Sequence, residues 1–247
     1  MSIKKILGIL LILLSILFLG LQSLGRELDA FGIKALAMFM LTVYYIFTVK
    51  KKHILFLLFV IIYASAEIHN YLTYNVLPPD GSEIDIHYVL GNLLYVLAYV
   101  FLIARIFSIM NFKRAISKFP LQSLLLFVLG IFVVNMITDL SVPEIEYDYS
   151  YAVEMVYNTV IMFLVCLALI NYMYNDTKKS MNLLIGAICI VFSEVIQIAY
   201  YYITDLDNTL SVIYSFFLVG AFVFFYLQSR LTQEYNTIYE EQQDLKV

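Results

Sequence analysis

The 247-residue sequence is poor in charge, cysteine, proline and glycine. Charged residues make up only 14% of it, and it has nine Gly, four Pro, two Cys and no Trp. So little glycine and proline excludes a collagen-like chain, and two cysteines are too few for a disulfide scaffold. The net charge of −4 leaves no basic domain to neutralise phosphates, so we expect no nucleic-acid partner.

Apolar residues are in excess instead, at 62% of the chain, against roughly 45–50% in a soluble domain. A helix of about 20 apolar residues crosses a bilayer core of about 30 Å. Charged or turn-rich breaks divide the chain into eight stretches of suitable length. These are residues 5–24, 33–49, 54–77, 86–108, 121–140, 150–172, 181–203 and 209–231.

These eight stretches predict an all-α polytopic membrane protein, an eight-transmembrane-helix bundle, because runs this long satisfy their backbone in lipid as helices. We expect residues 1–231 to form a single transmembrane domain and residues 232–247 a short cytoplasmic polar tail. The first stretch is interpreted as a retained helix rather than a signal peptide. Its apolar run exceeds the usual length of about 7–15 residues, and no A-x-A cleavage site follows it.

Lysine and arginine are distributed unevenly between the two sides of this predicted bundle. Thirteen lie on the side that holds both termini and the second, fourth and sixth loops. The other side has only Arg26 and Lys34. Since cytoplasmic loops carry the excess of positive residues, we expect both termini to be cytoplasmic and the protein to lie in a bacterial inner membrane.

The polar residues within the spans fall in the half of the bundle away from the termini. They are Glu67, His69, Asn70, Asn92, Asn135, Asp139, Glu154, Asn158, Glu194 and Gln197. Their convergence predicts a polar cavity in the extracytoplasmic half, and an ionisable group inside a span is usually functional. Asp139 and Glu154 lie near helix ends and are expected to be interfacial, whereas Glu67 and Glu194 lie deeper.

Helical spacing of three or four residues groups these side chains into shared faces. Asn70 lies on the face of Glu67, and Gln197 lies on the face of Glu194. Asn92, Tyr95 and Tyr99 form a third stripe. His69 has no second histidine at metal-ligand spacing, so we expect no metal and no other cofactor. Cys166 and Cys189 are interpreted as packing residues.

Two segments of the chain are similar to each other. Residues 63–71 and 192–197 each place a small residue before a Glu and an amide three residues after it. One interpretation is a pair of four-helix parallel repeats that bring Glu67 and Glu194 to a central interface. Chance similarity in a chain rich in Leu, Ile and Tyr is the alternative.

At these two acids the chain resembles the YhhN-type lysoplasmalogenase-like membrane proteins, a family of eight-span bundles of similar length. The family has a Gly-Asp in an early span and a Ser-Asp in a late one. The corresponding segments here are Ala66-Glu67, Ser193-Glu194, Gly91 to Tyr95, Gly186-Ala187 and Tyr214. The chain departs from the family in having Glu for both Asp residues, Tyr99 in place of a histidine, and no Gln after Tyr214.

The resemblance implies an integral membrane hydrolase that cleaves the vinyl ether of a lysoplasmalogen or similar ether lysolipid. Glu67 and Glu194 would be the catalytic acid and base, in an order that the sequence leaves open. We expect the substrate to be bound by Asn70, Asn92, Tyr95, Tyr99, Gln197 and Tyr214. The alternatives are a non-catalytic protein that binds a lipid or small molecule and, ranked last, a proton-coupled transporter.

Overall fold

The computed structural model describes residues 3–76, 84–141, 148–202 and 208–231. In this part of the chain it contains nine α-helices and no strand. They are α1 (Ile3–Ser23), α2 (Glu27–Thr48), α3 (Ile54–Thr73), α4 (Ile86–Ile109), α5 (Phe112–Lys118), α6 (Pro120–Ser141), α7 (Asp148–Asn175), α8 (Lys178–Tyr202) and α9 (Asn208–Arg230). All except α5 are long and apolar enough to cross a membrane. The predicted eight-helix all-α membrane bundle is therefore confirmed.

The largest difference from the predicted boundaries is at α2, which begins at Glu27, six residues before the predicted span. The chain turns at Gly25, whose φ of 66° lies in the left-handed region that favours glycine. Glu27 and Asp29 then occupy the first turn of α2, where carboxylates interact favourably with the helix dipole. The longer helix places Lys34 about two turns inside α2 rather than at its end.

A second difference is the short helix α5, which occupies part of the predicted break between residues 111 and 120. The Asn111 side chain caps it by accepting a hydrogen bond from the Arg114 amide at 3.2 Å. Helix α6 then starts at Pro120, a favoured residue for a first helical turn. The predicted tail at 232–247 lies outside the described residues.

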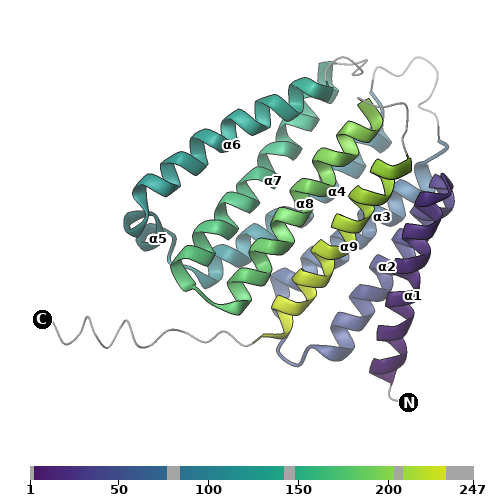
Figure 1. Cartoon of the computed structure of the whole chain (residues 1–247), viewed down its shortest axis with the longest axis horizontal. Coiled ribbons are helices and arrows are strands. Elements are labelled where there is room, and N and C mark those ends of the chain that lie inside the picture. The colour runs from purple at the N-terminus through teal and green to yellow at the C-terminus, as the bar shows by residue number, and fades with distance from the viewer. Residues whose placement is uncertain (1–2, 77–83, 142–147, 203–207, 232–247) are drawn as a thin grey trace, which may run out of the picture.

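Seven of the long helices form a closed ring, in the order α1, α2, α3, α4, α7, α8, α9 and back to α1. Helix α6 lies outside this ring and packs mainly on α7 (Figure 1). Helix α1 begins and α9 ends at the same end of the bundle (Figure 1). We call this the terminal end, and the other the opposite end.

The ring does not have the two-fold symmetry that a simple pair of four-helix repeats would produce. Consecutive long helices pack together in both halves. The halves are joined by α1 on α9 and by α4 on α7. A two-fold repeat would require α6 to pack on α4 as α1 packs on α9, and the described residues form no comparable contact.

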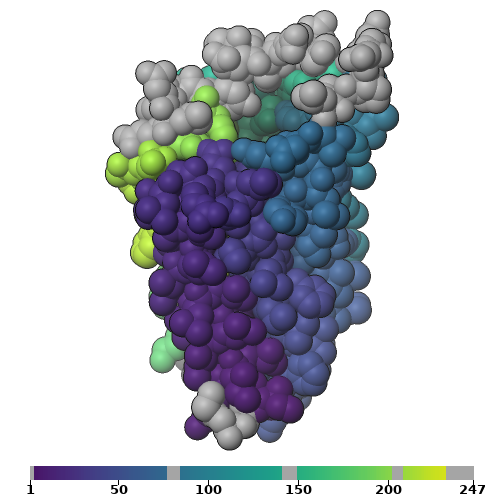
Figure 2. Space-filling view, turned by 90° about the vertical axis from the view of Figure 1, so that its right-hand side faces the viewer, coloured from purple at the N-terminus to yellow at the C-terminus, as the bar shows by residue number. Residues whose placement is uncertain are grey.

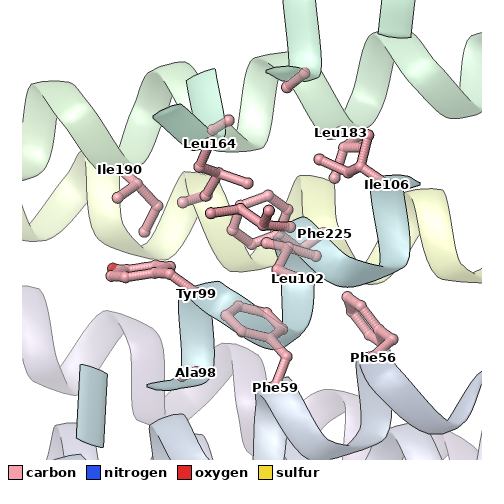
Figure 3. Close-up of a cluster of buried hydrophobic side chains, with 14 of the residues drawn as sticks. Phe56, Phe59, Ala98, Tyr99, Leu102, Ile106, Leu164, Leu183, Ile190 and Phe225 are labelled. Atoms are coloured by element: carbon pink, nitrogen blue, oxygen red, sulfur yellow. The ribbon is translucent and has the colours of Figure 1, made fainter. Parts of the chain in front are cut away.

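The hydrophobic core lies between α2, α3, α4, α7, α8 and α9, which all contribute to one buried cluster (Figure 3). Phe59 and Phe225 are fully buried at its centre, with their rings edge to face at 5.5 Å. Gly186 lets α8 approach α9 closely, because a Cβ there would lie 2.6 Å from the Phe225 ring. The core therefore fixes how the helices that carry the polar residues sit against one another.

Candidate polar site inside the bundle

The charge centre of the site is an ion pair between α2 and α3. Lys34 Nζ lies 2.8 Å from Glu67 Oε2, and the two side chains are only 14% and 1% exposed. The sequence predicts Glu67 as a site residue, whereas it places Lys34 among the charges outside the membrane. The signal that would have found Lys34 is its position seven residues after Glu27, two turns into a helix that starts at that acid.

A tyrosine and an amide extend the site from Glu67. Asn70, one turn further along α3, donates a hydrogen bond from Nδ2 to the Tyr95 hydroxyl at 3.1 Å. Because the Tyr95 oxygen accepts from Asn70, its own proton is available to another acceptor, and Tyr95 lies near Glu67. Gly91 makes this possible, since a Cβ there would lie 2.5 Å from Asn70 Oδ1. The structure therefore brings Asn70, Tyr95 and Glu67 together.

Four tyrosines from three helices occupy the space between the two predicted acids. Tyr63 lies 5.0 Å from Tyr95 and 6.0 Å from Tyr99, measured between ring centroids. Tyr157 on α7 lies 6.3 Å from each of Tyr95 and Tyr99. We call Tyr63, Tyr95, Tyr99 and Tyr157 the tyrosine cluster. Tyr63 lies one turn before Glu67 on the same helix face, but neither Tyr63 nor Tyr157 was predicted as a site residue.

The tyrosine cluster ends at Glu194 on α8. The Tyr157 hydroxyl donates a hydrogen bond to Glu194 Oε1 at 2.8 Å. Glu194 is also close enough to Lys34 and Glu67 for their charges to interact. Tyr95 and Tyr99 each interact electrostatically with both acids. Glu67 and Glu194 therefore face one polar interior, although they lie on different helices.

Glu67 and Glu194 have different partners, and this difference matters most for proton transfer at the site. Glu67 has an ammonium beside it, and its Oε1 has no hydrogen-bond partner among the residues that the structure describes. Glu194 is held by a neutral hydroxyl. Two carboxyl groups in unlike environments are suited to opposite roles in proton transfer.

Two of the predicted binding residues, Asn92 and Tyr214, make their hydrogen bonds outside this arrangement. Asn92 donates to the backbone oxygen of Tyr88 on its own helix at 3.0 Å. Tyr214 accepts from Gln22 Nε2 at 3.1 Å, and Ser193 Oγ donates to the Tyr214 backbone oxygen at 2.8 Å. Gln197 is half-buried one turn along α8 from Glu194.

Three other polar residues of the predicted cavity also lie away from the tyrosine cluster or have partners of their own. Asp139 and Asn135 are exposed on α6, outside the ring. Glu154 is half-buried and accepts a hydrogen bond from the Tyr88 hydroxyl at 2.7 Å. It is therefore paired with a neighbouring helix rather than simply interfacial.

An apolar groove reaches the site from the side of the bundle. It has a volume of about 870 Å³ and lies between α1, α2 and α9. Helix α1 is the purple helix at the front of Figure 2. Its lining runs from Lys5 to Leu19 on α1 and includes Lys34 on α2. Ile12 and Ile16 of this lining are each 62% exposed, so the groove is open to the membrane beside these residues.

No known protein-family model, curated protein or solved structure matches this chain. The resemblance to the YhhN-type family therefore stays a prediction. No group of three or more His, Cys, Asp or Glu able to hold a metal ion occurs in the described ranges. Cys166 and Cys189 are free thiols.

Proposed function

We propose that this chain is an integral membrane hydrolase that acts on a lysoplasmalogen or a similar ether lysolipid. The observation that carries the proposal is the apolar groove that includes Lys34 in its lining, with Glu67 ion-paired to that lysine. A groove open to the membrane suits an alkyl chain, and polar groups at one point along it suit the head of the same molecule. The resemblance to lysoplasmalogenases supports the same reaction.

The proposed reaction uses water and two carboxyl groups. Glu194 transfers a proton to the vinyl carbon that is not bonded to the ether oxygen, and the electrons of the double bond form the new C–H bond. The oxocarbenium ion that results is attacked by water, whose proton passes to Glu67. The hemiacetal then collapses, its hydroxyl proton moves to the leaving oxygen, and a fatty aldehyde and a glycerophospho alcohol are released.

The neighbouring residues have supporting roles in this proposal. Lys34 holds the Glu67 carboxyl in place through their ion pair, so that Glu67 stabilises the cation and accepts the proton. Tyr157 orients the Glu194 carboxyl through their hydrogen bond. Asn70 and Tyr95 hold the glycerol hydroxyls or the attacking water. Tyr99 lines the same interior, and Asn92, Gln197 and Tyr214 support the helices around it.

Filling the groove is expected to suppress turnover of long-chain substrates. Ala37 lines the groove on α2, so Ala37→Phe narrows the space for the alkyl chain. We expect purified protein to release aldehyde from a long-chain lysoplasmalogen, and Ala37→Phe to lower kcat/KM by about tenfold or more, a loss of about 1.4 kcal/mol. Aldehyde release is measured in nanodiscs.

Leu36→Phe is the matched control for this variant, because Leu36 is the preceding residue, is 42% exposed and lies outside the groove. It is expected to retain wild-type turnover. A saturated alkyl ether lysolipid has no vinyl carbon to protonate and should release no aldehyde. Equal losses in the two variants would contradict a role for the groove. Binding of both lipids without aldehyde release would favour the non-catalytic binding protein instead.

We also propose that the terminal end is cytoplasmic in a bacterial inner membrane. Positive residues gather there in the described loops, including Lys50 to Lys52 and Lys113. With both native cysteines replaced by Ser, Lys51→Cys and Asn75→Cys place a thiol at the terminal and the opposite end. An impermeant maleimide on intact cells should label Asn75→Cys alone, and labelling of Lys51→Cys before permeabilisation would reverse the orientation.

A further inference from the structure

A buried arginine lies at the terminal end of the bundle, on the far side of the hydrophobic core from the polar site. Arg105 on α4 is only 4% exposed. Its guanidinium carbon lies 4.8 Å from the centroid of the Phe56 ring. Its Nε and Nη1 atoms have no hydrogen-bond partner within the described segments. Buried guanidinium groups are normally paired or hydrogen-bonded, so these donors need an explanation.

Two further basic groups lie around Arg105. His53 and Lys179 are both half-buried, and each interacts electrostatically with Arg105. His53 Nε2 lies 3.4 Å from Ser108 Oγ, and the Tyr45 hydroxyl accepts from the His53 amide at 3.2 Å. These two contacts join α2, α3 and α4 at this end of the bundle.

No carboxylate balances these charges within the described residues. The ion pairs there are Arg26 with Asp29 and Lys34 with Glu67, and neither involves Arg105 or Lys179. Burial and the positive charges of Arg105 and Lys179 together lower the pKa of His53. The cluster is therefore a concentration of positive charge next to a low-dielectric core, which attracts an anion strongly.

Two buried amides lie toward the same end of the bundle. Asn171 and Gln228 are 0% and 1% exposed, and their side-chain nitrogens have no hydrogen-bond partner in the described ranges. Residues three or four apart lie on one helix face. Five polar residues each lie one turn closer to the terminal end than a core residue of the same or the adjoining helix: Arg105, His53, Lys179, Asn171 and Gln228. Those core residues are Leu102, Phe56, Leu183, Leu167 and Phe225. Figure 3 shows Phe56 and Leu183 at the same end of the core.

We propose that Arg105, Lys179 and His53 bind a phosphate-type oxyanion at the terminal end of the bundle. A planar guanidinium binds two oxygens of a phosphate at once, and an ammonium adds a point charge. Basic pockets between transmembrane helices bind lipid head groups in this way, and free phosphate has the same chemistry. This inference is independent of the proposed hydrolase activity.

The test follows the ring signals of the three histidines by NMR in protein with 13C-labelled histidine. Two arms separate the two sources of phosphate. Inorganic phosphate is titrated into protein in detergent, and the protein is separately placed in nanodiscs of phosphatidylcholine with or without about one third phosphatidylglycerol. Binding is expected to raise the pKa of His53, because the anion offsets the charges of Arg105 and Lys179. His69 and His87 lie at the other end of their helices and should not respond.

A saturable response to inorganic phosphate identifies free phosphate, and a response to phosphatidylglycerol alone identifies a lipid head group. Arg105→Gln and Lys179→Gln should each weaken the response about tenfold or more, since each removes a charged donor. Lys113→Gln is the matched control, because Lys113 is an exposed lysine at the same end. A response unchanged in Lys179→Gln, or no response to either source, would overturn the proposal even if Arg105→Gln failed to fold.

Discussion

Lys34→Met is expected to lower the free energy of unfolding by about 3 kcal/mol, the lower end of the range for breaking a buried ion pair. The variant leaves the Glu67 carboxylate, whose side chain is 1% exposed, buried without its cation. The lower end applies because Lys34 is itself 14% exposed. Equilibrium unfolding in mixed micelles measures the loss.

An exposed ion pair at the start of α2 is the control for the buried pair of Lys34 and Glu67. Arg26 and Asp29 lie 2.6 Å apart near the start of α2, with side chains 62% and 49% exposed. Arg26→Met should cost less than about 1 kcal/mol, since exposed ion pairs contribute little. If Lys34→Met is no more destabilising than Arg26→Met, the pair with Glu67 does not stabilise the fold as we infer.

The double variant Lys34→Met with Glu67→Leu separates folding from function. Replacing both members of a buried ion pair by apolar residues is often neutral or stabilising, so much of the lost stability should return. Aldehyde release should be absent in the double variant, because the proposed base is gone. Turnover by a refolded, stable double variant would exclude Glu67 from the reaction.

The two acids of the site could be predicted from the sequence because an ionisable residue in an apolar run is rare and costly. The sequence also predicted that Glu67 and Glu194 face one interior, since they lie at similar depth in helices that run in the same direction. Lys34 was missed for a local reason. The predicted span began at residue 33, because the charges from Arg26 to Asp29 were interpreted as a break rather than as the first turn of α2.

Other parts of the site depend on contacts that no local pattern encodes. Helical spacing places Tyr63 on the face of Glu67, but Tyr157 is one of 21 tyrosines, and only its position between two helices distinguishes it. Asn92 shares a helix face with Tyr95, yet its amide bonds the Tyr88 backbone, which competes with a role in the site. The groove depends on α1 packing against α9 at the far end of the chain, so spacing along one helix does not reveal it.

Glu194→Gln is expected to lower kcat by about 10² to 10⁴, the usual contribution of a general acid. The amide keeps the size of the side chain and still accepts from Tyr157, so the fold should be retained, but it has no acidic proton to transfer. Tyr157→Phe should have a smaller effect of about tenfold, because it removes only the hydrogen bond of 2.8 Å that orients the acid. Single-turnover aldehyde release measures both.

Glu154→Gln is the control for this comparison, since the same type of bond occurs there with Tyr88, which is not part of the tyrosine cluster. Glu154 is also half-buried and accepts from a tyrosine, Tyr88, at 2.7 Å. Its replacement should leave kcat within about threefold of wild type. Equal losses in Glu154→Gln and Glu194→Gln would mean that carboxylates in this half of the bundle act through packing. Loss confined to Glu194→Gln, with normal unfolding, is the result that a proton donor at this position requires.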